Sequence, residues 1–416
     1  MIWHPESAIP AKISALSRVA SRLTADDAAA LRAAGRPVLQ LEGSPYWSPP
    51  RHVHEAAARA LSKPDAAPSQ GLWDLRRSFA AKLHRDNGID ADPRSEILVT
   101  NAANHGLSIV FAGLLQPGDE VVMPSPCYQY NGILELVGAK AVHASSSVET
   151  GWRWNLELID RAVTSRTRLL ILNTPTNPTG YVASRQDLLD AIAIAEKHNL
   201  LVVSDEAYDN MLFDGYKHIS TGSLTQSSQQ SQRIVTIYSM TKSYAMRGWR
   251  VGFIVAAPPL IAQFRKILEW NCLAVNLVVQ HAAQAALDGP QDWLKEISSR
   301  FQRARDLMIE GLRGAPGLRF AVPRGAPFLF INVEELGIVG EQFSKVLLTE
   351  FGVPSESGGY FADPMCIRLE VGGDDDVVIE AANRIREAAV RIGNGTEQDV
   401  RPLTESGLIG PTDRLL

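Results

Sequence analysis

The middle of the chain alternates short apolar runs with longer segments in which apolar residues recur at helical spacing, such as Gln186–His198. Alternation of this kind predicts an α/β fold with a mostly parallel sheet flanked by helices. The expected strands are Ile97–Thr100, Glu120–Met123, Lys140–His143, Leu169–Asn173, Leu201–Ser204, Val235–Tyr238 and Arg250–Val255. Asn177, Asp205 and Lys242 follow strand ends. We therefore expect them at the sheet edge where such folds bind ligands.

A chain of 416 residues exceeds one ordinary hydrophobic core, so at least two domains are expected. After Pro258 the pattern becomes helical over Ile261–Leu287 and again over Pro290–Gly314. A smaller α+β domain should follow. Its expected strands are Leu318–Val322, Phe328–Val333 and Cys366–Val371, and its expected helices are Gly340–Phe351 and Asp375–Ile392.

The predicted division has three parts. Residues 1–50 form an N-terminal segment of the small domain or a dimer arm, with a helix expected over Ala11–Gly35. Residues 51–289 form the large, ligand-binding domain. Residues 290–416 form the small domain, which ends in a loosely held polar tail.

One lysine lies where a strand should give way to a loop. The segment Ser239-Met240-Thr241-Lys242 follows an apolar run, and Arg250 follows eight residues after the lysine. Two hydroxyls and a guanidinium are thus within reach of a doubly charged anion beside an amine. A lysine that forms a Schiff base with pyridoxal phosphate needs such surroundings, because the aldehyde and the phosphate belong to one rigid molecule. For this segment alone, a surface lysine in a polar turn is the alternative.

Two other segments specify the same site. Asn173–Gly180 reads as a rigid turn after a strand, and Ser204–Tyr208 ends a short buried strand with the sequence Ser-Asp-Glu-Ala-Tyr. Combined in this order with Ser-x-x-Lys-x7-Arg, they resemble the class I/II, fold-type I aminotransferases that use pyridoxal phosphate. The resemblance is to the branch with aspartate, aromatic and alanine aminotransferases, and it runs from about Leu39 to Val390.

The resemblance implies roles for five side chains around the cofactor ring. Lys242 would form the Schiff base and move the proton between the substrate Cα and C4′. Asp205 would pair with the pyridine nitrogen and keep the ring protonated. Asn177 and Tyr208 would hydrogen-bond the ring O3′. Tyr128 would stack on the ring, the alternative being an ordinary half-buried tyrosine.

The resemblance also implies which groups hold the phosphate. Ser239 and Arg250 would bind it with side chains, and Ala102, Ala103 and Asn104 with backbone amides at a helix start. Relatives usually carry glycine in place of Ala102, so the alanine is a slightly less permissive choice.

For the substrate, the resemblance implies an α-carboxylate clamped by the bidentate fork of Arg368, with Gly43 and Asn177 nearby. An arginine on a solvated strand face is the alternative for Arg368. Tyr46 and Trp47, in a loop that departs from the family pattern, would shape the side-chain pocket.

Other departures leave the reaction open. Relatives carry a tyrosine, which reaches the partner subunit's phosphate, where this chain has Asp65-Ala66-Ala67. Either another residue such as Ser69 or Gln70 takes its place, or the phosphate is held more lightly. Leu273–Val279 also lacks the serines usual there.

Transamination between an amino acid and a 2-oxo acid is our first hypothesis. The second is β- or γ-elimination, replacement, cyclisation or oxidation in specialised biosynthesis. The third is a regulator that has lost catalysis.

Composition narrows the partners. A net charge of −5 with interspersed signs argues against a nucleic-acid-binding surface. The chain also lacks a run of about 18 apolar residues, which a membrane span would need. Cys127, Cys272 and Cys366 are few and widely spaced, which indicates a reducing compartment and no metal site. Residues 1–10 lack the apolar core of a signal peptide. We therefore expect a cytoplasmic enzyme of amino acid metabolism, and the resemblance implies a homodimer.

Overall fold

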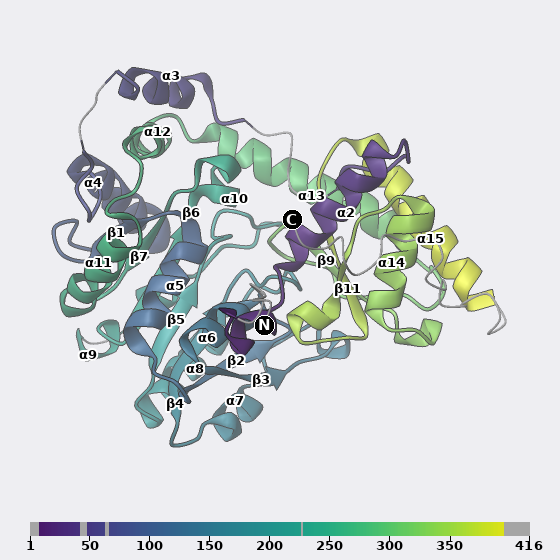
Figure 1. The fold of residues 1–416 in the computed structure, drawn as a ribbon, viewed down its shortest axis with the longest axis horizontal. Helices are drawn as coiled ribbons and strands as arrows, with labels where there is room; N and C mark the ends of the chain where they lie inside the picture. Colours follow the sequence, from purple (N-terminus) through teal and green to yellow (C-terminus); the bar gives the residue numbers. More distant parts are fainter. Residues whose placement is uncertain (1–7, 42–47, 63–65, 226–227, 395–416) are drawn as a thin grey trace, which may run out of the picture.

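The computed structural model describes residues 8–41, 48–62, 66–225 and 228–394. Its larger part is built on a seven-stranded sheet in the order β1-β7-β6-β5-β4-β2-β3 (Figure 1). Every pair of neighbours is parallel except the two that involve β7, which is antiparallel to β1 and β6. The strands are β1 (Ile97–Thr100), β2 (Glu120–Ser125), β3 (Lys140–Ser145), β4 (Thr167–Asn173), β5 (Leu201–Asp205), β6 (Ile234–Ser239) and β7 (Gly252–Val255).

Helices cover both faces of this sheet. Val202 and Val203 are successive residues of β5 and belong to different hydrophobic cores, because alternate side chains of a strand point to opposite faces. The core of Val203 is closed by α5 (Ala102–Leu114), α6 (Tyr130–Val137) and α11 (Pro258–Cys272). The core of Val202 is closed by α7 (Leu156–Ala162) and α8 (Arg185–Lys197). A third core joins β1, β6 and β7 to α3 (Arg51–Ala60), α4 (Trp73–Lys82) and α12 (Leu277–Asp288).

The smaller part is a four-stranded antiparallel sheet in the order β10-β11-β9-β8, covered by helices. Its elements are β8 (Arg319–Phe320), β9 (Phe328–Asn332), β10 (Glu356–Ser357), β11 (Cys366–Glu370), α14 (Gly340–Phe351) and α15 (Asp375–Asn394). The helix α13 (Asp292–Leu312) links the two parts (Figure 1). Phe301 packs with Met211 and Phe213, whereas Met308 and Leu312 belong to the smaller core.

The α/β class, the mostly parallel sheet and the smaller α+β part are confirmed. The domain boundaries at residues 50 and 289 stay a prediction. Among the described residues, no helix has the length and apolar character needed to cross a membrane.

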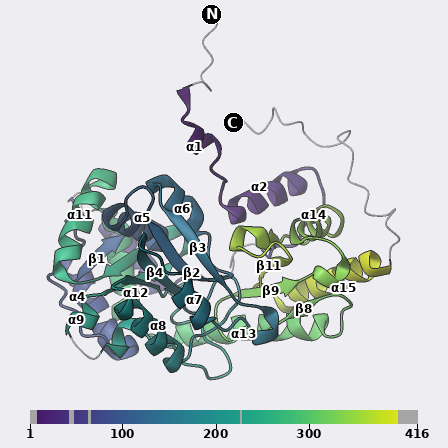
Figure 2. The same ribbon diagram turned by 90° about the horizontal axis from the view of Figure 1, so that it is seen from below.

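The expected single helix over Ala11–Gly35 is wrong. The structure has α1 (Ala11–Ser14) and α2 (Ala20–Ala33), with extended backbone at Val19 between them. The Ala20 N–H donates to Gln129 Oε1 at 3.1 Å, so the start of α2 is set by a tertiary contact. Figure 2 shows α2 lying over the smaller part, beside α14.

Two other boundaries differ from the expectation. The helical region Ile261–Leu287 is two helices, because Leu273 adopts a positive φ of 61° that ends α11. Arg250 likewise has φ 57°, so β7 begins at Gly252 rather than at Arg250. The remaining short α-helices of the described residues are α9 (Ser228–Ser231) and α10 (Met240–Ser243).

Candidate active site

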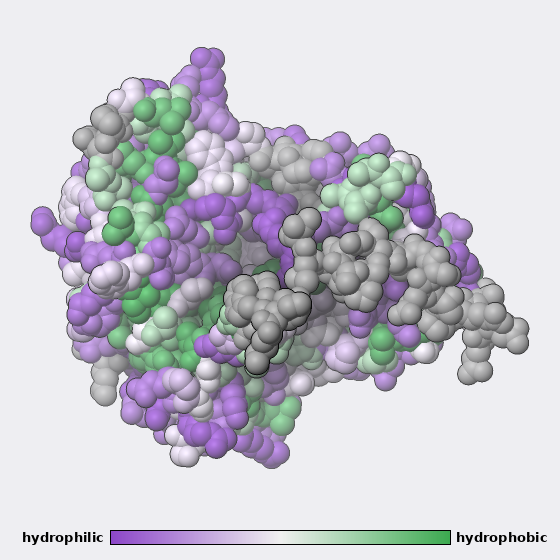
Figure 3. Space-filling view, viewed as in Figure 1, coloured by the Kyte–Doolittle hydropathy of each residue, from purple (hydrophilic) through white to green (hydrophobic). Residues whose placement is uncertain are grey.

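A cavity of about 250 Å³ opens at the carboxyl ends of β4, β5 and β6, next to the smaller sheet. Figure 3 shows a hollow near the centre of this face, bordered by hydrophilic side chains. An apolar cavity of about 150 Å³ holds benzene, so this one has room for a substituted ring. Its lining includes every predicted site residue that the structure describes: Ala102, Ala103, Asn104, Tyr128, Asn177, Asp205, Tyr208, Ser239, Lys242, Arg250 and Arg368. Gly43, Tyr46 and Trp47 lie outside the described residues.

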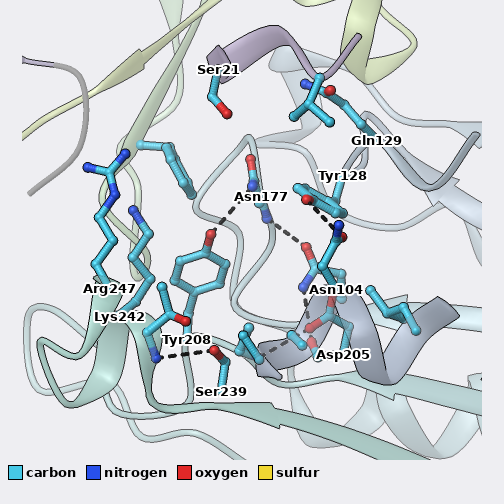
Figure 4. Close-up of a pocket in the computed structure, with 18 of the residues that line it drawn as sticks. Ser21, Asn104, Tyr128, Gln129, Asn177, Asp205, Tyr208, Ser239, Lys242 and Arg247 are labelled. Carbon is cyan, nitrogen blue, oxygen red and sulfur yellow. Dashed lines mark hydrogen bonds between the residues drawn. The ribbon is translucent and has the colours of Figure 1, made fainter. Parts of the chain in front are cut away.

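Lys242 is presented by the short helix α10, which begins where β6 ends. Ser239 caps this helix, because its Oγ accepts a hydrogen bond from the Thr241 N–H at 3.2 Å. Lys242 Nζ donates to Glu370 Oε1 at 2.6 Å, and the lysine side chain is 15% exposed. The lysine is therefore a cavity residue, with Tyr208 and Asn177 facing the same space (Figure 4). The surface-lysine alternative is wrong.

Asp205 is the last residue of β5 and is buried. Burial raises its pKa to about 6, although hydrogen bonds from the Tyr130 hydroxyl and the Ala207 N–H favour the charged form. The Tyr130 hydroxyl donates to Asp205 Oδ2 at 2.7 Å. A cation such as a protonated ring nitrogen would stabilise this carboxylate, since an opposite charge favours ionisation.

Asn177 connects Tyr208 to Arg368. Its Nδ2 donates to the Tyr208 hydroxyl oxygen at 3.4 Å, and its Oδ1 accepts from Arg368 Nη1 at 2.7 Å. Its own backbone N–H donates to Asn173 Oδ1 at 2.7 Å, which fixes the loop after β4. Burial raises the pKa of Tyr208, so its hydroxyl keeps its proton and can donate into the cavity.

Arg368 lies on β11 and is buried, so it is not on a solvated strand face. Its Nε and Nη2 bind Glu356 Oε2 at 2.6 and 2.5 Å. The rings of Phe328 and Phe361 lie 4.4 and 4.5 Å from the guanidinium carbon. Since a guanidinium carries five N–H groups, the Glu356 and Asn177 contacts leave one N–H on each terminal nitrogen. These two form the end-on fork that a carboxylate can bind.

The other end of the cavity is cationic. Arg250 Nη1 donates to Thr241 Oγ1 at 3.5 Å and to the Arg247 carbonyl at 3.3 Å. Among the described residues no carboxylate pairs with Arg250, and its pKa is lowered by burial and by the charges of Arg22 and Arg247. Cations that repel one another in this way would be stabilised by a bound phosphate dianion.

The amino end of α5 faces this cationic region. Ala102 begins the helix with a φ of 66°, a left-handed conformation that suits glycine better than alanine. The alanine backbone is therefore strained at this position. Gly252 lies against it, and a Cβ there would come within 3.0 Å of the Ala102 backbone. Backbone amides at a helix start bind phosphate well.

Tyr128 also lines the cavity. Its hydroxyl donates to Asn104 Oδ1 at 3.2 Å, and its ring meets that of Tyr130 edge to face, with centroids 5.3 Å apart. The ring is thus held in place at the cavity wall, where it could stack on a planar ligand.

Neither suggested replacement for the missing tyrosine lies in the cavity of this chain. Ser69 Oγ donates to Glu269 Oε1 at 2.6 Å and accepts from Arg265 Nε at 2.7 Å. Gln70 Nε2 donates to the carbonyls of Arg94 and Ile97, each at 3.0 Å. Both side chains are therefore already held by contacts within their own chain.

Sequence reasoning missed several residues of the site, namely Arg22, Tyr130, Arg247, Glu356 and Glu370. A signal existed for Glu370, since it follows Arg368 by two positions on an expected strand and must share its face. Glu356 had no such signal, because β10 is only two residues long. No group of three or more His, Cys, Asp or Glu side chains within the described part of the chain could hold a metal ion.

The cavity therefore fits pyridoxal phosphate, with an amine, a buried carboxylate for a ring nitrogen and a cationic region for the phosphate. Comparison with known proteins agrees. The family model for aminotransferase class I and II matches residues 39–385. An aspartate aminotransferase of Pyrococcus abyssi is 33% identical over 83% of this chain and 90% of its own length. An aromatic-amino-acid aminotransferase of Thermococcus litoralis is 32% identical over the same shares.

Solved structures give the same result. The aspartate aminotransferase of Thermus thermophilus, in a structure with maleate, has a TM-score of 0.86 and 28% identity. The match covers 91% of this chain and 99% of that one. The resemblance drawn from the three sequence segments is confirmed. The chain belongs to the class I and II aminotransferases, a family of pyridoxal-phosphate-dependent transferases.

Proposed function

We propose that this enzyme moves the α-amino group of an amino acid to a 2-oxo acid, with the substrate carboxylate bound by Arg368 and the proton at Cα moved by Lys242. The observation that carries the proposal is the convergence of Lys242, Asp205 and Arg368 on one cavity, from the short helix α10 and the strands β5 and β11. Bound pyridoxal phosphate would supply an electron sink for the bond that breaks at Cα.

The chain's own residues would do the rest. The Asp205 carboxylate would hold a proton on the ring nitrogen, and Tyr130 keeps that carboxylate in place. Tyr208 and Asn177 would hydrogen-bond the ring oxygen. Arg368 would fix the substrate carboxylate, and the substrate Cα would then lie near Lys242, since both cations lie against the ring of Phe328.

The phosphate would bind at the cationic end. Arg250, Ser239 and the amides of Ala102, Ala103 and Asn104 are the groups available there in one chain. Tyr128 would cover one face of the ring. Gly43, which is outside the described residues, stays the predicted neighbour of the substrate carboxylate.

We also propose a homodimer in the cytoplasm. Trp270 and Leu273 near the end of α11 are 93% and 76% exposed in the single chain, which supports a covered surface there. The three cysteines form no disulfide, which supports a reducing compartment.

The test is the visible absorption spectrum of the cofactor-loaded protein while α-amino acids are added singly, without an acceptor. Transamination predicts conversion of the aldehyde form of the cofactor to its amine form, with one equivalent of 2-oxo acid. Release of ammonia or a cyclised product in place of that conversion would overturn the proposal in favour of elimination, cyclisation or oxidation. A protein whose spectrum responds to no amino acid would instead favour a binding or regulatory protein that has lost catalysis.

A further inference from the structure

Glu370 is a carboxylate of the cavity that the proposed function leaves without a role. It follows Arg368 by two residues on β11, and both side chains line the cavity, whereas Leu369 between them is buried in the smaller core. The Glu370 side chain is 10% exposed and accepts a hydrogen bond from Lys242 Nζ at 2.6 Å.

Its charge follows from its surroundings. Burial raises the pKa of Glu370, but the charge and hydrogen bond of Lys242, with the charges of Arg247 and Arg368, lower it overall. Glu370 is therefore an anion at neutral pH, at the point in the cavity where an amine lies.

We propose that Glu370 binds the α-ammonium group of the incoming amino acid while Arg368 binds its α-carboxylate. The inference rests on the proposed function, because it takes an amino acid to be the ligand. The amine of that amino acid must reach the place where the Lys242 amine reacts, and Glu370 already binds an ammonium group there. Residues two apart on a strand are separated by about 7 Å. A zwitterion can bridge two charged side chains at this spacing, with one charge toward each.

The arrangement distinguishes an amino acid from the same acid without its amine. An acid that lacks the ammonium group gains nothing from Glu370 and brings a negative charge toward it. A hydrogen bond between charged groups changes affinity by about ten- to a hundredfold. Glu370 is thus a specificity-determining residue for the amine.

The test measures binding rather than turnover. Calorimetric titration would use the protein loaded with the amine form of the cofactor, which forms no Schiff base with an added amine, and three pairs of ligands that differ only in the α-amino group. They are 2-aminoisobutyrate with 2-methylpropanoate, α-methylphenylalanine with 2-methyl-3-phenylpropanoate, and α-methylaspartate with 2-methylsuccinate. With this form of the cofactor the α-methyl amino acids form no Schiff base, and they have no hydrogen on Cα that could be removed. We expect the wild type to prefer the amino member of at least one pair, and Glu370→Gln to lower that preference about tenfold or more.

Matched variants separate this role from others. Glu370→Asp keeps the charge and should retain most of the preference. Glu356→Gln loosens Arg368 and should weaken both members of a pair alike. If circular dichroism shows that Glu370→Gln does not fold, Glu370→Ala is judged by the same criterion.

Two results would overturn the inference. One is a wild type with no preference in any pair, and the other is a preference that the neutral variants leave within about threefold. A different result would contradict the proposed function without contradicting the role of Glu370. If no 2-oxo acid forms from any amino acid but the preference still falls in Glu370→Gln, transamination is wrong and the role of Glu370 stands.

Discussion

At the scale of single residues, opposite charges in pairs decide what the site can bind. Arg368 is paired with Glu356 and Lys242 with Glu370, so neither cation is an isolated charge in the cavity. Asp205 has hydrogen-bond donors but no cation among the described residues. It is therefore the acid that gains most from a positively charged ring nitrogen.

Replacement of Asp205 tests that statement. We expect Asp205→Ala to retain the cofactor, because Lys242 and the cationic end still hold it, but to slow the half-reaction roughly a hundredfold or more. Stopped-flow absorbance with a reactive amino acid measures the rate. Asp214→Ala, which removes a carboxylate outside the cavity lining, is the control. Near-normal turnover in Asp205→Ala would contradict the assigned role.

The raised pKa of Asp205 also affects stability in the cofactor-free protein. The pKa of Asp205 is about 6 in the folded protein and 3.8 for a solvated carboxyl such as that of the unfolded chain. Ionisation of Asp205 therefore costs more free energy in the folded protein, and the charged form disfavours folding. That loss of stability is complete above about pH 6 and disappears as the pH falls below 3.8. Asp205→Asn should therefore be more stable than wild type at pH 7, by on the order of 3 kcal/mol, with the difference shrinking toward pH 4. Urea denaturation at several pH values measures it, and a difference that does not vary with pH would count against this account.

At the scale of elements, strand ends and helix starts place the reactive groups. β5 ends at Asp205 and β6 ends at Ser239, while α5 begins at Ala102 with a strained backbone. The strain exists because the amides of that turn must face the cavity although the residue is not glycine.

Relief of this strain is measurable. Ala102→Gly should stabilise the cofactor-free protein by up to about 1 kcal/mol. A left-handed conformation costs alanine about 1–2 kcal/mol, and the greater conformational entropy of glycine in the unfolded chain offsets part of the gain. Ala103→Gly, one residue further into the helix, should instead destabilise it by up to about 1 kcal/mol. Chemical denaturation compares the two. Equal effects of the two substitutions would show that Ala102 is unstrained.

A buried ion pair ties α4 to the loop after β5. Lys82 Nζ binds Asp209 and donates to Asn87 Oδ1 at 2.7 Å, and Asp209 also accepts from Ser243 Oγ at 3.1 Å, next to Lys242. Lys82→Ala would leave Asp209 buried without its cation, and we expect a loss of about 3–5 kcal/mol in the free energy of unfolding. Arg51→Ala, which breaks an exposed pair with Glu55, should cost under about 1 kcal/mol. Similar losses in both variants would contradict the distinction.

At the scale of the whole molecule, the site lies between two separately packed sheets. Lys242 and Asp205 come from the larger sheet, and Arg368, Glu356 and Glu370 come from the smaller one. α13 contributes side chains to the smaller core and to a separate cluster that contains Tyr208 and Phe328, which both line the cavity.

The proposed dimer is also tested at this scale. Sedimentation should give about twice the chain mass of 45.4 kDa. Trp270→Glu should shift the protein toward monomer, because it places a charge on an exposed apolar side chain of the surface expected to be covered. Val322→Glu, on another exposed residue, should leave the mass unchanged. A wild type that sediments as a monomer would contradict the dimer.

Local sequence patterns were sufficient to predict the larger sheet and the residues at its edge. Alternating apolar runs predicted the strands of the larger part to within a few residues, and three short segments predicted the lysine, the acid and the asparagine that share the cavity. Helix breaks at Ser14 and Leu273 were not predicted. Apolar spacing continues through both places, and the breaks depend on contacts or backbone angles that spacing does not encode.

The sequence by itself determined the fold class, the family and the main residues that line the cavity, because strand ends and turn residues act over a few neighbouring positions. Only the tertiary structure decided which side chains meet in the cavity. Lys242 and Glu370 are 128 residues apart, and Arg368 and Asn177 are 191 apart. Such pairs form where the larger and smaller parts of the molecule meet, and no local period in the sequence records that packing.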